Sequence, residues 1–294
     1  MKKVWKMAVC GLVCAMAFCG CGTSESTSEE ANADRVVKKE FADPVFEKYL
    51  RSALGNLGGE LTEGELGAIK QIGIGYWGNG MSISYNNVNE NLNFSDDICV
   101  PYLTEESEWG DAQRIYIQSL EDLEKLPNLE VVCLEGGNDN VNVFKNFDFV
   151  KELPNLKVLT GTCAAPTLEP LRNCTALERL WLHSVNDISP LADCTNLRIL
   201  ELHMNESTGG FSALENLNQL EQLNIQFYSD TSFDANVLKD MKNLEHLEIL
   251  GASMDNPEVL LELPNLKEFY FFKDDIGIDD TILQQLRDKG VQMW

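Results

Sequence analysis

Basic residues are scarce in this chain. Among its 294 residues, 23 Lys and Arg stand against 47 Asp and Glu, which gives a formal net charge of -24. Proteins that bind nucleic acids depend on Lys and Arg to neutralise phosphates. The scarcity therefore excludes nucleic acid as a main partner. A content of 44% hydrophobic residues suffices for a core and argues against disorder.

Long apolar runs are also missing. The apolar run from Met7 to Cys19 has 13 residues, fewer than the roughly 18–20 that a membrane-spanning helix needs. Three lysines within the first six residues precede it, as in an export signal. We therefore predict a signal peptide over residues 1–20.

The end of this run, Gly20-Cys21-Gly22, resembles the lipobox of bacterial lipoproteins. The resemblance implies that Cys21 becomes the new amino terminus and carries a diacylglycerol and an acyl lipid. The polar residues that follow are expected to form a tether over residues 21–40. Because two or more acyl chains anchor a protein stably, the chain is expected outside the cytoplasm on a bacterial membrane. The alternative is cleavage after Ala17, which would release a secreted protein.

Sequence motifs for catalysis are absent. The chain contains no His-Glu-x-x-His, no Gly-x-Ser-x-Gly and no Gly-x-x-x-x-Gly-Lys-Ser/Thr. The acidic run from Asp274 to Asp280 lacks the spacing of a calcium-binding EF-hand loop. We therefore predict a non-enzymatic protein with no cofactor besides the lipid on Cys21. An enzyme acting through residues 76–111 is a further alternative.

Cysteines are too few in the body of the chain for a disulfide framework. Four of the nine lie in the first 21 residues, and an odd number remains: Cys99, Cys133, Cys163, Cys174 and Cys194. Cys174 and Cys194 occupy equivalent places in neighbouring repeats, where we expect them to pack inward as small apolar residues. An oxidised Cys174–Cys194 pair is the alternative outside the cytoplasm.

A short repeated pattern fills most of the chain. Large apolar residues stand at positions one, four and six of Leu177–Leu182, Leu197–Leu202, Leu220–Ile225 and Leu244–Ile249. Further copies begin at Ile69, Ala112, Leu129, Leu156 and Leu266, and from Leu129 onward the starts are 27, 21, 20, 23, 24 and 22 residues apart. This period is typical of leucine-rich repeats.

The repeats predict an α/β leucine-rich repeat solenoid. Each repeat adds one strand to a curved parallel sheet, with positions four and six inward and an irregular or helical convex side. The segment Asp187–Leu197 resembles the repeats of internalin-like bacterial surface proteins. The expected parts are an amino-terminal helical cap with a first repeat strand (41–75), an insertion (76–111), the repeats (112–273) and a carboxy-terminal cap (274–294).

The caps carry their own signals. Asp43 and Pro44 predict the start of a helix that continues to Leu54, and Thr62 and Glu65 predict a capping box for a short helix over 62–68. A helix capped by Asp279 or Asp280 and ending near 286, followed by a strand over 291–294, is expected to close the other end. Two strands, 81–85 and 98–102, are expected inside the insertion.

Positions three, five and seven of each strand point outward and predict a binding surface. This concave face collects rings and charges that no core requires, and such residues are enriched in protein interfaces. We predict contacts to a partner from Tyr116, Arg179, Trp181, His183, Glu201, His203, His246, Glu248, Tyr270 and Phe272.

The predicted function is therefore binding of a protein or peptide outside the cytoplasm. The glutamates of the concave face favour a partner with basic groups. His183 and His203 are expected to be ladder neighbours. The alternative function is a small-ligand or metal-binding lipoprotein that uses His183, His203 and Glu201.

Overall fold

The computed structural model describes residues 35–37, 40–75, 80–95, 97–101, 103–106, 112–134, 147–164, 167–205, 210–272 and 277–294, with residues 106 and 162–164 described by their backbone only. The predicted signal peptide, Cys21 and most of the predicted tether lie outside these ranges. Three other predicted features also lie outside these ranges: Glu135, one of the glutamates expected on the concave face, Tyr102, the last residue of the expected strand 98–102, and residues 274 and 275 of the acidic run.

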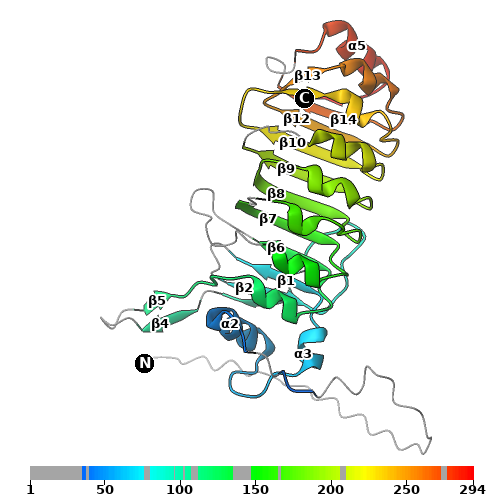
Figure 1. The fold of residues 1–294 in the computed structure, drawn as a ribbon. Coiled ribbons are helices and arrows are strands. Elements are labelled where there is room, and N and C mark those ends of the chain that lie inside the picture. The colour runs from blue at the N-terminus through cyan, green and yellow to red at the C-terminus, as the bar shows by residue number, and fades with distance from the viewer. Residues whose placement is uncertain are drawn as a thin grey trace, which may run out of the picture.

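The described chain forms a leucine-rich repeat solenoid built on one 11-stranded sheet, seen as a stack of strands in Figure 1. The strands lie in the order β15-β14-β12-β10-β9-β8-β7-β6-β1-β2-β3, and all pairs from β15 to β1 are parallel. The repeat strands are β1 (Gln71–Ile74), β6 (Val131–Leu134), β7 (Val158–Ala164), β8 (Arg179–Val185), β9 (Ile199–Met204), β10 (Gln222–Phe227), β12 (His246–Leu250) and β14 (Glu268–Phe271).

The predicted inward positions are confirmed in these strands. Leu180 and Leu182 of β8 are fully buried, and Leu200 and Leu202 pair with them in register on β9. Short 3-10 helices form the convex side: η2 (Glu121–Lys125), η3 (Asp148–Glu152), η4 (Glu169–Leu171), η5 (Ser189–Asp193), η6 (Phe211–Asn216), η7 (Ala235–Leu238) and η8 (Pro257–Glu262). Their leucines fill the core between the convex side and the sheet.

An asparagine three residues before the start of several strands ties neighbouring repeats together. The side-chain amide of Asn196 donates to the Thr175 carbonyl at 2.7 Å, and that of Asn265 donates to the Lys242 carbonyl at 2.7 Å. Asn128 makes the equivalent bond to the Gly67 carbonyl at 2.8 Å. These bonds give a partner to backbone carbonyls at the junctions between repeats, which explains why the repeats carry asparagine there.

Both ends of the solenoid are capped at the predicted positions. Helix α2 (Pro44–Leu54) begins after the N-cap Asp43, and α3 (Glu63–Gly67) begins at a complete Thr62–Glu65 capping box. At the other end, α5 (Asp280–Asp288) follows the N-cap Asp279, and β15 (Gln292–Met293) adds a last parallel strand. The caps cover apolar ends that would otherwise face water.

The prediction of a repeat strand over Ala112–Ile117 is wrong. Strand β5 (Ala112–Arg114) pairs antiparallel with β4 (Thr104–Glu106) in a separate hairpin, and β1 pairs directly with β6. Ile117 is fully buried in the core, but the backbone amide of Ile115 bonds to Leu103 instead of a neighbouring repeat. The alternation of apolar residues over Ala112–Ile117 thus reflects burial against the core and does not reflect pairing in the main sheet.

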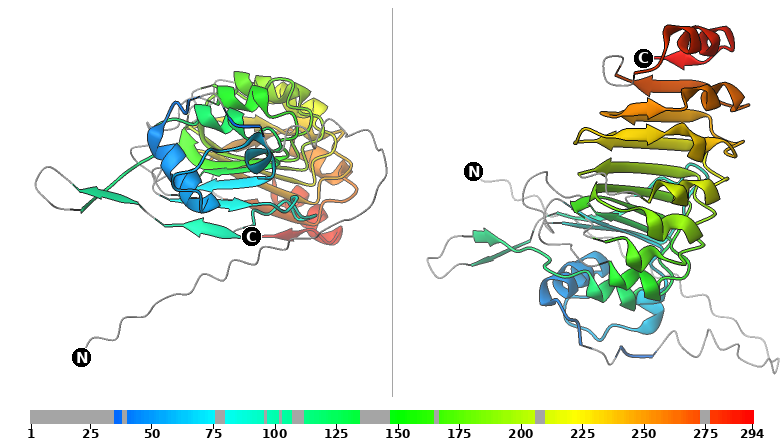
Figure 2. Two further views of the ribbon diagram at one scale, coloured as in Figure 1. Left: turned by 90° about the horizontal axis from the view of Figure 1, so that it is seen from below. Right: turned by 45° about the horizontal axis from the view of Figure 1, so that its top comes forward.

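The chain between β1 and β6 also extends the sheet. Strands β2 (Met81–Ser84) and β3 (Ile98–Val100) lie within the two predicted segments and pair antiparallel beyond β1. The β4–β5 hairpin projects from the body near α2, as both views of Figure 2 show. A small second sheet joins β11 (Ser232–Asp234) to β13 (Ser253–Asp255).

Candidate binding surface on the concave face

The outward face of the sheet is divided into a covered and an open half. Residues 85–95, here called the cover segment, connect β2 to β3 and pack on the outward side of β6 and β7. Leu92, Val131 and Val158 are only 3%, 0% and 1% exposed in this contact. The outward positions of the first repeats are therefore unavailable to a partner, although their register predicts a free surface.

The open half begins at β8 and runs across β9, β10, β12 and β14; we call it the open face. One row of it, read in register across five adjacent strands, consists of Trp181, Glu201, Asn224, Glu248 and Tyr270. All five side chains are partly buried. Two carboxylates and an amide thus lie between two aromatic rings.

A stack of rings lies along the same strands. The rings of His183 and His203 are stacked with centroids 3.9 Å apart and planes 14° apart. Trp181 packs edge-on against His183 at 5.6 Å, and Tyr228 lies 6.0 Å from His203. The hydroxyl of Tyr228 and Nδ1 of His203 share a 2.9 Å hydrogen bond.

A bulge in β8 places His183 in this stack. The pairing of β8 with β9 passes from Leu182–Leu202 to Val185–Met204, so two residues of β8 oppose His203 alone. Ser184, the second of the two, has a φ of 56°, which lies in the left-handed region. His183 and His203 are neighbours as predicted, but they meet through a bulge and not through a regular ladder.

A second group of rings closes the far end of the open face. His246 lies 5.0 Å from Tyr270, which stacks on Trp294 at 5.8 Å. Nδ1 of His246 lies 2.9 Å from a carboxylate oxygen of Glu268. Aromatic side chains therefore stand at both ends of the Glu201–Asn224–Glu248 row.

Burial sets the electrostatics of the open face. It lowers the pKa of His183 to about 4, helped by the charge that His203 would carry, and it lowers the pKa of His203 as well. Both imidazoles are therefore neutral at pH 7. Burial raises the pKa of Glu201; Arg179 opposes this change and Glu248 adds to it.

Four buried polar atoms of the open face have no hydrogen-bond partner among the described residues. They are Nε of Arg179, Nε1 of Trp181, Nε2 of His183 and Oδ1 of Asn224. A buried polar group without a partner costs about 1–3 kcal/mol. A bound molecule that supplied donors and acceptors here would recover part of that cost.

The described residues contain no group of three or more His, Cys, Asp and Glu that could hold a metal ion. The stacked arrangement of His183 and His203 is also unsuited to holding a metal ion. The lone pair of an imidazole nitrogen lies in the ring plane, so two nearly parallel stacked rings do not converge on one ion. Nδ1 of His203 is also engaged by Tyr228. His183, His203 and Glu201 thus form part of a surface of rings and charges.

Most of the predicted contact residues meet on the open face, but Tyr116 does not. Tyr116 follows the β4–β5 hairpin and lies outside the main sheet, because the strand predicted around it does not join the sheet. Phe272 is 55% exposed and comes directly after the end of β14. Arg179, Trp181, His183, Glu201, His203, His246, Glu248 and Tyr270 all lie on the strands of the open face.

Three contributors were missed by reasoning from the repeat. Tyr228 follows the end of β10, Trp294 follows β15, and Asn224 is a small polar residue in an outward position. The position of Trp294 at the end of the predicted closing strand 291–294 is the one signal that could have found it. The cover segment carried no such signal, because its apolar residues lie outside the repeat pattern.

Among the described residues, Cys99, Cys174 and Cys194 are free thiols. Burial raises the pKa of Cys194 to about 12 and also raises that of Cys174. Cys194 is buried, and its thiol donates to the Leu171 carbonyl at 3.4 Å. Inward packing, and not an oxidised pair, is what the structure shows at these positions.

Comparison with solved structures shows the same fold. The chain is similar to internalin C2 of Listeria monocytogenes, with 17% identity over 86% of this chain and 94% of that chain and a TM-score of 0.54. A second Listeria internalin, inlF, aligns over 86% and 88% of the chains at 16% identity and a TM-score of 0.37. The Arabidopsis receptor kinase HAESA, solved with the peptide hormone IDA and the co-receptor SERK1, aligns over 51% of this chain and 27% of its own length, at 21% identity and a TM-score of 0.40.

The likeness to internalin C2 supports the leucine-rich repeat fold and nothing about the ligand. Neither the protein-family models nor the curated proteins gave a match. Among the described residues, no helix has the length and apolar character needed to cross a membrane.

Proposed function

We propose that this chain binds a protein or peptide partner through the open face and has no enzymatic role. The observation that carries the proposal is the row from Trp181 to Tyr270, in which rings and carboxylates occupy the outward side of a sheet whose core lies on the other side. Aromatic side chains in such positions provide a large contact area at low cost in conformational entropy.

The chemistry of this row favours a partner segment with a basic side chain. Glu201 and Glu248 stand on either side of Asn224, whose Oδ1 lacks a partner among the described residues. A Lys or Arg side chain offers donors to all three, and its charge suits both carboxylates and the faces of the flanking rings. The overall charge of -24 adds long-range attraction for such a partner.

We further propose that the protein acts on the outside of a bacterial membrane, held by lipid on Cys21. The support is in the sequence: the lysines and apolar run of residues 1–19, the Gly20-Cys21-Gly22 segment and the polar stretch after it. An anchored domain with an open concave surface is suited to meeting other macromolecules at the cell surface.

A selection experiment tests the binding proposal. The full chain, purified in detergent, is used to select from a displayed library of random 12-residue peptides. We expect selected peptides to be enriched in Lys or Arg. Trp181→Ala and Tyr270→Ala should each weaken their binding roughly 30-fold, because buried aromatic anchors contribute about 2 kcal/mol.

Leu57→Ala is the control for this test. Leu57 is a large exposed apolar residue between α2 and α3, at the other end of the molecule. Its removal should leave the affinity unchanged. Peptides that bind all of these variants as tightly as the parent would show that the open face is not the binding surface.

A further inference from the structure

The cover segment closes the amino-terminal half of the concave face with a cluster of its own. Leu92 packs with Val131 and Val158, and Val88, Phe94 and Ile199 add to the same contact, separately from the main core. The outward residues of β6 and β7 in this cluster, Val131 and Val158, are apolar, whereas the row of the open face is aromatic and polar. The two halves of the face differ in chemistry because the covered half packs against another segment of the same chain.

Polar contacts fix both ends of the cover segment to the sheet. The amide of Gln71 donates to the Asn86 carbonyl at 2.9 Å, and its oxygen accepts from the Ser95 backbone amide at 2.8 Å. The backbone amide of Val88 donates to a Glu130 carboxylate oxygen at 3.3 Å.

Gly73 also adapts the sheet to this segment. A Cβ atom at this position would lie 2.9 Å from the ring of Phe94. The absence of a side chain therefore lets the ring sit directly on β1. The close packing of Phe94 on Gly73 and the hydrogen bonds of Gln71 to both ends of the segment indicate that the cover segment is a fixed part of the fold.

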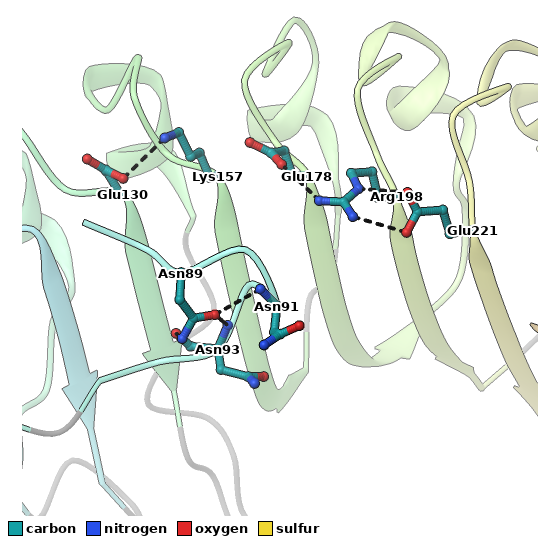
Figure 3. A network of polar contacts seen from close by, with 8 residues as sticks. All are labelled: Asn89, Asn91, Asn93, Glu130, Lys157, Glu178, Arg198 and Glu221. Carbon is teal, nitrogen blue, oxygen red and sulfur yellow. Dashed lines mark hydrogen bonds and ion pairs between the residues drawn. The ribbon is translucent and has the colours of Figure 1, made fainter. Parts of the chain in front are cut away.

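The tip of the cover segment borders the open face. Figure 3 shows Asn89, Asn91 and Asn93 on this loop in front of the strands. Oδ1 of Asn89 accepts from the backbone amides of Asn91 and Asn93 at 3.0 and 3.2 Å, so the turn is organised before any partner arrives. Oδ1 of Asn93 accepts from Nη1 of Arg179 at 3.2 Å, which joins the tip to β8.

We infer that the cover segment is a fixed wall of the binding surface and that its exposed amides, Asn91 and Asn93, contact the partner. This inference rests on the proposed function of the open face. The wall limits the surface to the five strands from β8 to β14, whose four steps of about 4.8 Å span about 19 Å. An extended peptide of roughly six residues covers that distance, at about 3.3 Å per residue. The partner is thus a short exposed segment with one basic side chain.

The first test needs no partner. In hydrogen–deuterium exchange of the full chain in detergent, residues 85–95 should exchange at least 100-fold more slowly than the exposed turn at 56–60. Exchange at the rate of that turn would show that the segment is not fixed, which would overturn the inference whatever the open face binds.

The second test uses the peptides selected on the parent chain. The Asn91→Ala/Asn93→Ala double variant should bind them at least 10-fold more weakly, whereas Asn87→Ala, at the β2 end of the segment, should bind them normally. Leu92→Asp, which places a charge against Val131 and Val158, should also weaken binding.

The outcomes separate this inference from the proposed function. Unchanged affinity in the double variant, with the loss still seen for Trp181→Ala, would make the segment only a structural cover. Tighter binding by Leu92→Asp would show that the partner displaces the cover segment, which would contradict a fixed wall. If Trp181→Ala has no effect either, the proposed function itself fails.

Discussion

At the scale of single residues, the open face depends on two histidines that burial keeps neutral. A stacked pair of imidazoles tolerates one charge poorly and two charges worse, because like charges at 3.9 Å repel in a partly dry environment. The pKa of His183 is lowered to about 4, and that of His203 is lowered in the same sense. The rings can therefore act as flat contact surfaces at neutral pH.

This predicts a pH dependence of stability. The unfolded chain binds protons at both histidines below about pH 6.5, whereas the folded chain resists them until about pH 4 at His183. The stabilisation is complete above pH 6.5 and is lost as the pH falls toward 4. The midpoint of urea unfolding should thus fall less between pH 7 and 4.5 in the His183→Gln/His203→Gln variant than in the parent.

Comparing the two proteins removes other contributions. The raised pKa of Glu201 acts with the opposite sign, since its contribution is lost as the pH rises through the folded value, but it is present in both proteins. If the midpoint of urea unfolding changes with pH in the same way in parent and variant, the two histidines have the same pKa in the folded and unfolded states, and the prediction is wrong.

At the scale of elements, two aspartates join the amino-terminal cap to the first convex turn. Asp122 of η2 is fully buried and accepts from the backbone amides of Ala42 and Asp43 at 2.9 and 2.8 Å. Lys125 lies 2.9 Å from the same carboxylate. Asp43 in turn accepts from the amides of Gln118 and Ser119 while it caps α2.

Asp122→Ala should accordingly destabilise the protein by about 3–5 kcal/mol, because it leaves a largely buried lysine and two amides without their acceptor. Urea unfolding followed by circular dichroism measures this change. Glu169→Ala, which removes the exposed ion-pair partner of Arg172, is the control and should leave the free energy of unfolding nearly unchanged, because exposed ion pairs contribute little to stability. Equal losses in both variants would contradict the role of Asp122 as a buried tie.

At the scale of the whole molecule, the described chain is a stack of repeats in which the strand of each repeat pairs with the strands of the neighbouring repeats. Helices close the stack at both ends. The cap with α2 and α3, which follows the predicted tether in the sequence, forms one end of the stack. A lipid on Cys21 would therefore hold the solenoid by this end and leave the open face, at the other end, farther from the membrane.

The anchor is tested by metabolic labelling. When the full chain is produced in a bacterium supplied with an alkyne fatty acid, the parent should take up the label because Cys21 is acylated. Cys21→Ser should not be labelled, and Cys19→Ser, two residues away, should be labelled like the parent. Labelling of the Cys21→Ser variant, or none in the parent, would contradict the anchor.

The strands, caps and inward residues could be predicted because they depend on local pattern. Leucines at positions four and six, Asp43 before Pro44 and the Thr62–Glu65 pair each act within a few residues. The prediction of a repeat strand over Ala112–Ile117 was wrong because it also rested on a local pattern alone. Buried residues alternate along any extended chain that runs beside a core, whether or not it pairs with a sheet.

The sequence by itself determined the solenoid, its register and the rings and glutamates on the outward strand positions, since period and side-chain alternation require no distant information. Only the tertiary structure decided which part of that face is free. The cover segment packs on strands that follow it by about 40 to 65 residues, through apolar contacts that belong to no repeat. The stack of His183 on His203 likewise needed a bulge at Ser184. Long-range packing of this kind leaves no periodic trace in the sequence.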